Sequence, residues 1–194
     1  RYIAIILATS VLTKLLANPF FAGLGDKYGN RKIPMLYLSF ISIIILFSLN
    51  IFNSLYLIAF MAITSWALFA PLMPLTESLT TTAIKKYNFD YGNTRLWGSV
   101  SFIIIAFFGG IIIEKYGLKY VPILMTIGAL FLFLSIIIMP TIPSLPARKK
   151  FSTYALLKNR NFFPFLLACG AIQSSHGIYY GFSTIYWKSI GLSE

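Results

Sequence analysis

The stretch Ala22-Gly-Leu-Gly-Asp-Lys-Tyr-Gly-Asn-Arg-Lys32 decides how the rest of the chain is arranged. It contains three basic residues, one acid and three glycines, and it separates two apolar segments that are each long enough to cross a bilayer. Charges at this density do not enter hydrocarbon, and glycines disfavour a long helix. We therefore expect a tight, water-facing hinge between two antiparallel membrane helices.

The composition is that of a membrane protein. The 194 residues are 58% hydrophobic and only 11% charged, with a mean hydropathy of +0.79. A soluble domain carries about a quarter charged residues to cover its surface. The formal net charge of +11 sits mainly in short stretches between apolar segments, which is the membrane pattern. We therefore expect a lipid bilayer as partner and no nucleic acid.

Six apolar segments predict an all-α, polytopic membrane protein, with no strand-like alternation. They run over residues 2–24, 33–49, 55–83, 96–113, 120–139 and 162–187. Pro71 and Pro74 should bend the third segment. A polar loop is expected at 85–95, and a basic, proline-rich linker at 141–160. Residues 151–157 within that linker fit either a short amphipathic helix on the membrane surface or a plain tether.

The basic residues predict the orientation of the segments. Eleven of the 16 lie on the side of the hinge: Lys27, Arg31, Lys32, Lys85, Lys86, Arg95, Arg148, Lys149, Lys150, Lys158 and Arg160. Positively charged loops mark the cytoplasmic side. We therefore predict a multi-pass protein of the bacterial inner membrane, with hinge loop 25–32 and linker 141–160 in the cytoplasm.

The hinge resembles the loop signature of the major facilitator superfamily. The matching positions are Ala22, Asp26, Lys27, Gly29, Arg31 and Lys32, with alanine where the family usually has glycine. Three further stretches, Asn18-Pro19, 90–99 and 173–193, look like the 3-phenylpropionate/proton symporter-like branch, which is related to lactose and nucleoside permeases.

This resemblance implies a partial major facilitator fold, in which the six segments are helices two to seven of twelve. It implies that residues 1–140 belong to the first helix bundle, 141–160 to the linker between bundles, and 161–194 to the first helix of the second bundle. Helix one and helices eight to twelve would then be partners from the same polypeptide. It also implies that Asp26, Gly29 and Arg31 form the gating loop.

Lys14 is the one basic residue expected deep in the membrane. It lies about ten residues before the hinge, hence ~15 Å from the boundary at 1.5 Å per residue. A buried ammonium is costly unless it faces water or a partner. We favour a cavity-facing cation that holds an anionic substrate over a side chain that reaches a headgroup.

Glu77 is the one acid of the third segment. An acid within apolar helices suits a group that gains and loses a proton in each transport cycle. A structural ion pair, with Lys14 or with a loop lysine, fits equally well. We further hypothesise that a Lys14–Glu77 pair holds both charges until a substrate carboxylate displaces Glu77.

The sixth segment carries a polar stripe. Residues 173, 176, 177, 180 and 184 share one helix face, which places Gln173, His176 and Tyr180 together. A polar stripe should face protein or a cavity, since lipid would penalise it. Histidine is a common proton carrier, and a structural role for His176 is equally open. No second histidine or cysteine is spaced to bind a metal.

The predicted substrate and proton cavity is therefore Lys14, Glu77, Gln173, His176 and Tyr180. The predicted function is proton-coupled symport of a small organic solute by alternating access, with an aromatic carboxylate such as 3-phenylpropionate ranked first. A nucleoside or sugar symporter is the alternative, and a receptor or a membrane-embedded enzyme are rivals from other classes. The sequence has no nucleotide-binding loop, so ATP-driven transport is not expected. It shows no nucleophile–base pair or metal cluster within the apolar segments, so we expect a non-enzymatic membrane transporter without a cofactor.

Overall fold

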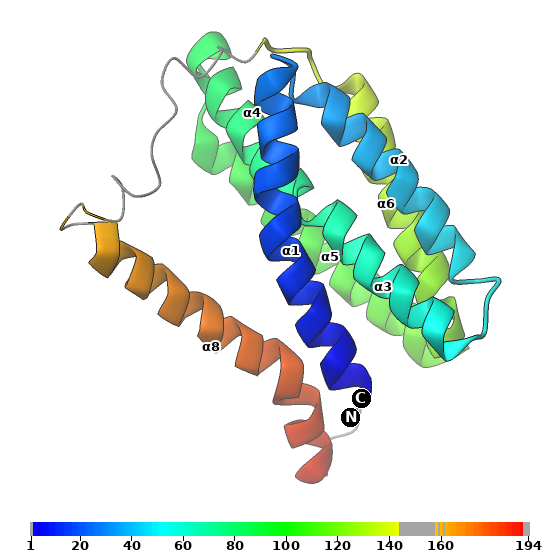
Figure 1. The fold of residues 1–194 in the computed structure, drawn as a ribbon. Coiled ribbons are helices and arrows are strands. Elements are labelled where there is room, and N and C mark those ends of the chain that lie inside the picture. Colours follow the sequence, from blue (N-terminus) through cyan, green and yellow to red (C-terminus); the bar gives the residue numbers. More distant parts are fainter. Residues whose placement is uncertain (1, 144–157, 159, 161, 192–194) are drawn as a thin grey trace. The chain divides into compact units, whose positions relative to one another are not determined.

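The chain is described by a computed structural model that covers residues 2–143, 158, 160 and 162–191 (Figure 1). The helices are α1 (Tyr2–Lys27), α2 (Lys32–Ser48), α3 (Leu55–Phe69), α4 (Leu72–Tyr87), α5 (Tyr91–Tyr116), α6 (Val121–Ile138) and α8 (Phe162–Ser189), with a 3₁₀ turn η1 (Leu118–Tyr120) before α6. The chain forms two compact units, Arg1–Pro146 and Ala147–Glu194. The possible surface helix at 151–157 lies outside the described residues.

Four of the described segments are long and apolar enough to cross a membrane. They are Ile5–Gly25, Leu55–Tyr87, Tyr91–Tyr116 and Leu118–Ile138. The helix α2 is apolar but shorter, at 17 residues. The helix α8 has 28 residues, and the polar run Gln173-Ser-Ser-His176 lowers its hydropathy. The predicted all-α membrane fold is confirmed, and the chain is a multi-pass membrane protein.

The third predicted segment is two helices. The helix α3 ends at Phe69, and α4 begins at Leu72 with Pro71 as its N-cap residue. Pro71 has no N–H and cannot continue the hydrogen bonds of α3. Pro74 lies in the first turn of α4, where an N–H would have no partner within the helix. The expected bend at the prolines is thus a break in the helix.

The predicted polar loop at 85–95 is wrong in its extent. It consists only of residues 88–90, because α4 continues to Tyr87 and α5 already begins at Tyr91. Asn88 ends α4 in the left-handed conformation, at φ 52°, which asparagine tolerates. The carboxylate of Asp90 accepts hydrogen bonds from the N–H groups of Gly92 and Asn93 and so caps α5. Arg95 therefore lies inside a helix.

The hinge is also shorter than predicted. The helix α1 extends through Asp26 to Lys27, and the turn itself is residues 28–31. Gly29 has φ 60°, a conformation that glycine adopts without strain. The backbone N–H of Lys32 donates to Oδ1 of Asn30, which satisfies one donor at the start of α2.

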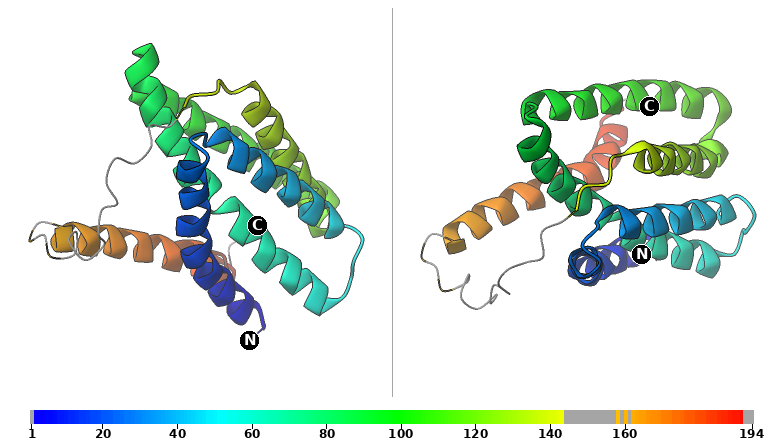
Figure 2. Two further views of the ribbon diagram at one scale, coloured as in Figure 1. Left: turned by 45° about the horizontal axis from the view of Figure 1, so that its top comes forward. Right: turned by 90° about the horizontal axis from the view of Figure 1, so that it is seen from above.

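The first unit is built around α2. This helix packs most extensively against α6 and also against α3, while α1 packs along α3, and the views of Figure 2 show α2 and α6 side by side. The main core cluster is Met35, Leu38, Leu68, Leu72, Leu75 and Ile136. Small hydroxyl residues are buried with it, and Ser39 and Ser42 donate to carbonyls one turn earlier. Small side chains of this kind let membrane helices approach closely.

The turn between α1 and α2 is fastened to the end of α6. The Lys32 ammonium donates to the carbonyl oxygens of Ile137 and Met139, at 2.8 and 2.5 Å. Asn30 forms an antiparallel bridge with Pro143. Ile142 is buried against Leu79 and Ala83 of α4. A cation at a helix C-terminus binds carbonyls that have no partner in the helix. Lys32, the last residue of the hinge stretch, thus holds the C-terminal end of α6.

Gly25 marks the closest approach of α1 to α4. A Cβ atom at this position would lie 3.2 Å from Cδ2 of Leu75 and 3.3 Å from Cγ of Arg31, whereas a Cβ at Gly23 would meet nothing within 4 Å. Contacts as short as those at Gly25 force the packed neighbours to move.

We predict that Gly25→Ala lowers the melting temperature and that Gly23→Ala does not. Alanine favours a helix over glycine by about 1 kcal/mol, so Gly23→Ala should leave the melting temperature unchanged or raise it. At Gly25 the strain against Leu75 should outweigh that gain. Thermal unfolding of the two variants in detergent measures the difference, and equal shifts would show that this contact is not tight.

Candidate functional site

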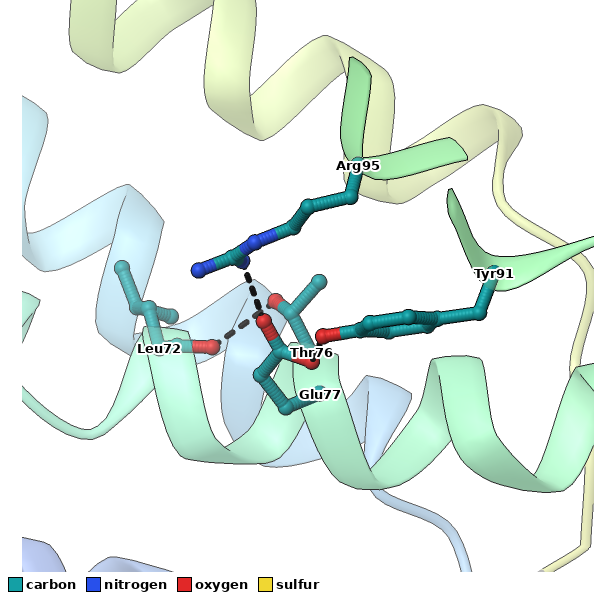
Figure 3. A network of polar contacts seen from close by, with 5 residues as sticks. All are labelled: Leu72, Thr76, Glu77, Tyr91 and Arg95. Atoms are coloured by element: carbon teal, nitrogen blue, oxygen red, sulfur yellow. Dashed lines mark hydrogen bonds and ion pairs between the residues drawn. The ribbon is translucent and has the colours of Figure 1, made fainter. Parts of the chain in front are cut away.

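A charged cluster joins α4 to α5. The Arg95 guanidinium forms an ion pair with Oε1 of Glu77, and the Tyr91 hydroxyl donates to Oε2 of Glu77 at 2.8 Å. Figure 3 shows both α5 side chains pointing toward the Glu77 carboxylate. Both oxygens of Glu77 are therefore occupied. This is the arrangement that a carboxylate needs among apolar helices.

The local sequence explains this geometry. Asp90 fixes the start of α5, and Tyr91 and Arg95 are four residues apart, so they share one face of the helix. Glu77 lies on the second turn of α4, beside Thr76, whose hydroxyl donates to the Leu72 carbonyl. The three-residue connection at 88–90 then brings the two helices together at these positions.

The ion pair remains accessible. The Glu77 side chain is 32% exposed and the Arg95 side chain 56% exposed. An arginine presents several donors in a planar fork and binds a second carboxylate in the same geometry. Arg95 could therefore exchange the Glu77 carboxylate for another one, and no unpaired charge would remain if Glu77 took up a proton in the exchange. That exchange is the chemistry that the site offers.

Arg95 and Tyr91 are missing from the predicted cavity. From the sequence, Arg95 is expected in the polar loop at 85–95, on the same side as the hinge. The signal that reveals its role is Asp90: an N-cap at this position puts Arg95 inside an apolar helix, where a cation requires a partner. The nearest acid on the preceding helix is Glu77.

The hypothesised Lys14–Glu77 pair is corrected by this cluster, because the partners that the structure gives Glu77 are Arg95 and Tyr91. Lys14 is half-buried on α1. It lies on the helix face that also carries the buried residues Ser10 and Ala17. It lies in the middle of α1, and its depth in the membrane and its role as a substrate-binding cation stay predictions.

The predicted residues of the last helix belong to the second unit and are described by themselves. Gln173 and His176 are exposed on α8. The Nδ1 atom of His176 lies 2.9 Å from the Ile172 carbonyl oxygen. The side chain of Tyr180 lies outside the described residues. These three residues stay predictions.

The hinge contacts α4 close to Glu77. Arg31 donates from Nη1 to the Ser78 carbonyl at 3.5 Å, and Gly25 packs near Leu75. The hinge therefore contacts α4 on both sides of Glu77 in sequence. Gly29 forms the turn itself, and the side chain of Asp26 lies outside the described residues.

Two hollows in the first unit are apolar. One, of about 370 Å³, is lined by residues of α1, α2 and α3 and by the turn between α1 and α2. The other, of about 500 Å³, lies between α2, α3 and α6 and is lined by residues including Trp66, Met125 and Gly128. Neither lining includes Lys14 or Glu77. Within the described residues, no group of three metal-binding side chains occurs.

Comparison with known proteins identifies relatives of this chain. The profile of the "MFS_1 like family" matches residues 1–194. The chain is 38% identical over 130 residues to the "Probable 3-phenylpropionic acid transporter" of Escherichia coli (strain K12). The aligned part covers 64% of this chain and 34% of that relative, so the chain matches about a third of the relative's length. No solved structure gave a significant match.

We predict that Glu77 and Arg95 are energetically coupled. Glu77→Gln and Arg95→Gln should each lower the melting temperature, because each leaves a charge without its partner. The double variant should be more stable than the sum of the two losses implies, by about 0.5–3 kcal/mol. Thermal unfolding of the four proteins measures this coupling. Strict additivity would mean that the ion pair contributes nothing.

We predict that Lys32→Met lowers the melting temperature more than Lys27→Met does. The first change removes two hydrogen bonds from a charged donor, each worth about 1.5–3 kcal/mol. Lys27 is exposed in the last turn of α1, where a cation contributes about 0.3–1 kcal/mol. Equal losses would contradict the anchoring of α6 by Lys32.

Proposed function

The chain belongs to the MFS_1-like family of the major facilitator superfamily, and from this premise we propose that it is part of a secondary active transporter. It carries a small organic solute across the bilayer by alternating access. The observation that carries the proposal is the accessible Glu77–Arg95 pair on apolar helices. Ion pairs within membrane spans are expensive and mark solute or ion pathways. Transport rather than catalysis also agrees with the named relative.

The proposed substrate is an aromatic carboxylate. Arg95 supplies a guanidinium that binds carboxylates in two-point geometry, and Lys14 offers a second cation on α1. The named relative is described as a probable 3-phenylpropionic acid transporter, which supports an aromatic acid over the alternative of a nucleoside or a sugar.

The proposed coupling ion is the proton, and Glu77 is its carrier. While Glu77 is ionised, it competes with the substrate carboxylate for Arg95. Protonation removes the charge of Glu77 and releases Arg95, so proton uptake and anion binding favour each other. This reciprocity is what a symporter requires. It replaces the hypothesis in which Lys14 held Glu77, and His176 remains a second candidate proton carrier on α8.

The proposed gate is the hinge. Arg31 donates to the carbonyl of Ser78, the residue after Glu77. A movement of the hinge would therefore move the backbone that carries Glu77. Asp26, Gly29 and Arg31 accordingly act in the change between inward- and outward-open states, on the cytoplasmic side that the basic residues predict.

The test is ligand-induced stabilisation of the full-length protein in detergent, because a ligand that binds only the folded state raises its melting temperature. We expect 3-phenylpropionate to raise it, and to raise it more at the more acidic of two pH values. With one proton taken up on binding, the affinity should fall by up to about tenfold per pH unit as the pH rises.

Two variants separate the roles. Glu77→Gln should bind 3-phenylpropionate with little pH dependence, because the competing charge is gone. Arg95→Gln should lose the ligand-induced shift at both pH values. A shift with nucleosides or sugars alone would keep the transporter and replace its substrate. An unchanged pH dependence in Glu77→Gln would assign the proton to another residue.

A further inference from the structure

The middle of α1 contains an acceptor atom without a donor. The Oδ1 atom of Asn18 is buried and has no hydrogen-bond partner among the described residues. A buried polar atom in this state is destabilising, and hydrocarbon offers no water to bind it. The amide does not serve to end the helix before Pro19, because α1 continues through that proline.

A candidate donor on the same face is Lys14. The two residues are four apart, so their Cβ atoms are about 5–6 Å from each other. Helical side chains lean toward the N-terminus, so the Asn18 amide lies over the turn that carries Lys14. Both positions belong to the face that buries Ser10 and Ala17.

Lys14 is a donor that lacks an acceptor. It is half-buried, and no hydrogen bond or ion pair of its ammonium occurs within the described part of the chain. Other polar side chains of α1 are already satisfied: Ser10 donates to the Ile6 carbonyl, and Thr13 donates to the Thr9 carbonyl. Lys14 and Asn18 are thus the donor and the acceptor that remain on this stretch.

We propose that Asn18 is the positioning residue for Lys14. The structure shows both groups without a partner among the described residues, and a change of the Lys14 rotamer in the substrate-free protein would let the ammonium donate to Oδ1 of Asn18, which would hold the cation against α1 and offset its cost in the membrane. A substrate carboxylate then takes over the ammonium. A neutral amide suits this role because it releases a cation more readily than a carboxylate would. This last step rests on the proposed function, whereas the pairing itself does not.

The pairing is tested by a double-mutant cycle of melting temperatures in the full-length protein, without ligand. Asn18→Leu should lower the melting temperature by about 2–4 °C when Lys14 is present. In Lys14→Met the same change should cause no loss, because the donor is gone. Thr13→Val is the matched control: its hydroxyl has a partner in the backbone, so its effect should be the same in both backgrounds. An equal effect of Asn18→Leu in both backgrounds would overturn the proposal.

A second variant, Asn18→Asp, tests the proposal even if Asn18→Leu fails to fold. Asn18→Asp keeps the size of the side chain and gives Lys14 a charged partner, so it should raise the melting temperature. It should also weaken 3-phenylpropionate binding about tenfold, because the carboxylate of the protein competes with that of the ligand. In the Lys14→Met background, Asn18→Asp should not affect ligand affinity through this competition, and an equal loss there would contradict the positioning role.

The double-mutant cycle tests the Lys14–Asn18 pair, and the ligand-induced shift tests the proposed function, so each can fail without the other. A non-additive cycle together with no ligand-induced shift in the parent protein would keep the Lys14–Asn18 pair and reject the proposed substrate. An additive cycle together with a normal shift would reject the pair and keep the proposed function.

Discussion

The structure depends on the cost of placing a charge among apolar helices. A cation or a carboxylate in hydrocarbon must find a partner, because water is absent. Most of the charged residues avoid this cost by lying near helix ends. Glu77 and Arg95 offset the cost by pairing with each other. Lys32 offsets it by binding the last carbonyls of α6. Glu77, Arg95 and Lys32 therefore also form specific long-range connections within the first unit.

The sequence predicted the helices well and the pairings poorly. Apolar runs of about 20 residues leave little choice of structure, because only helices satisfy the backbone within such a segment. The short connections between helices were harder to predict. Asp90 was assigned to a polar loop, whereas in the structure it caps α5. That one residue moved Arg95 from the membrane boundary into a helix. The choice between Lys14 and Arg95 as partner of Glu77 depends on how two helices meet, which no local pattern records.

The helix α4 links the proposed gate to the proposed proton site. The end of α1 approaches it at Leu75 through Gly25, and the turn after α1 contacts it at Ser78 through Arg31. Glu77 lies between these two contacts and faces α5. Ile142, which follows α6 and is buried, packs against the same helix further on. A single short helix therefore receives contacts from the hinge, from α5 and from the segment that follows α6.

Because the helix is interrupted at Ala70 and Pro71, a change in the direction of α4 relative to α3 should cost less than the same bend in an unbroken helix. Pro71 donates no hydrogen bond, so α4 can change its direction at that point without breaking a bond donated by this residue, while α3 stays packed along α1. A tilt of α4 about the buried Pro71 would therefore displace Glu77, which lies on the second turn of that helix.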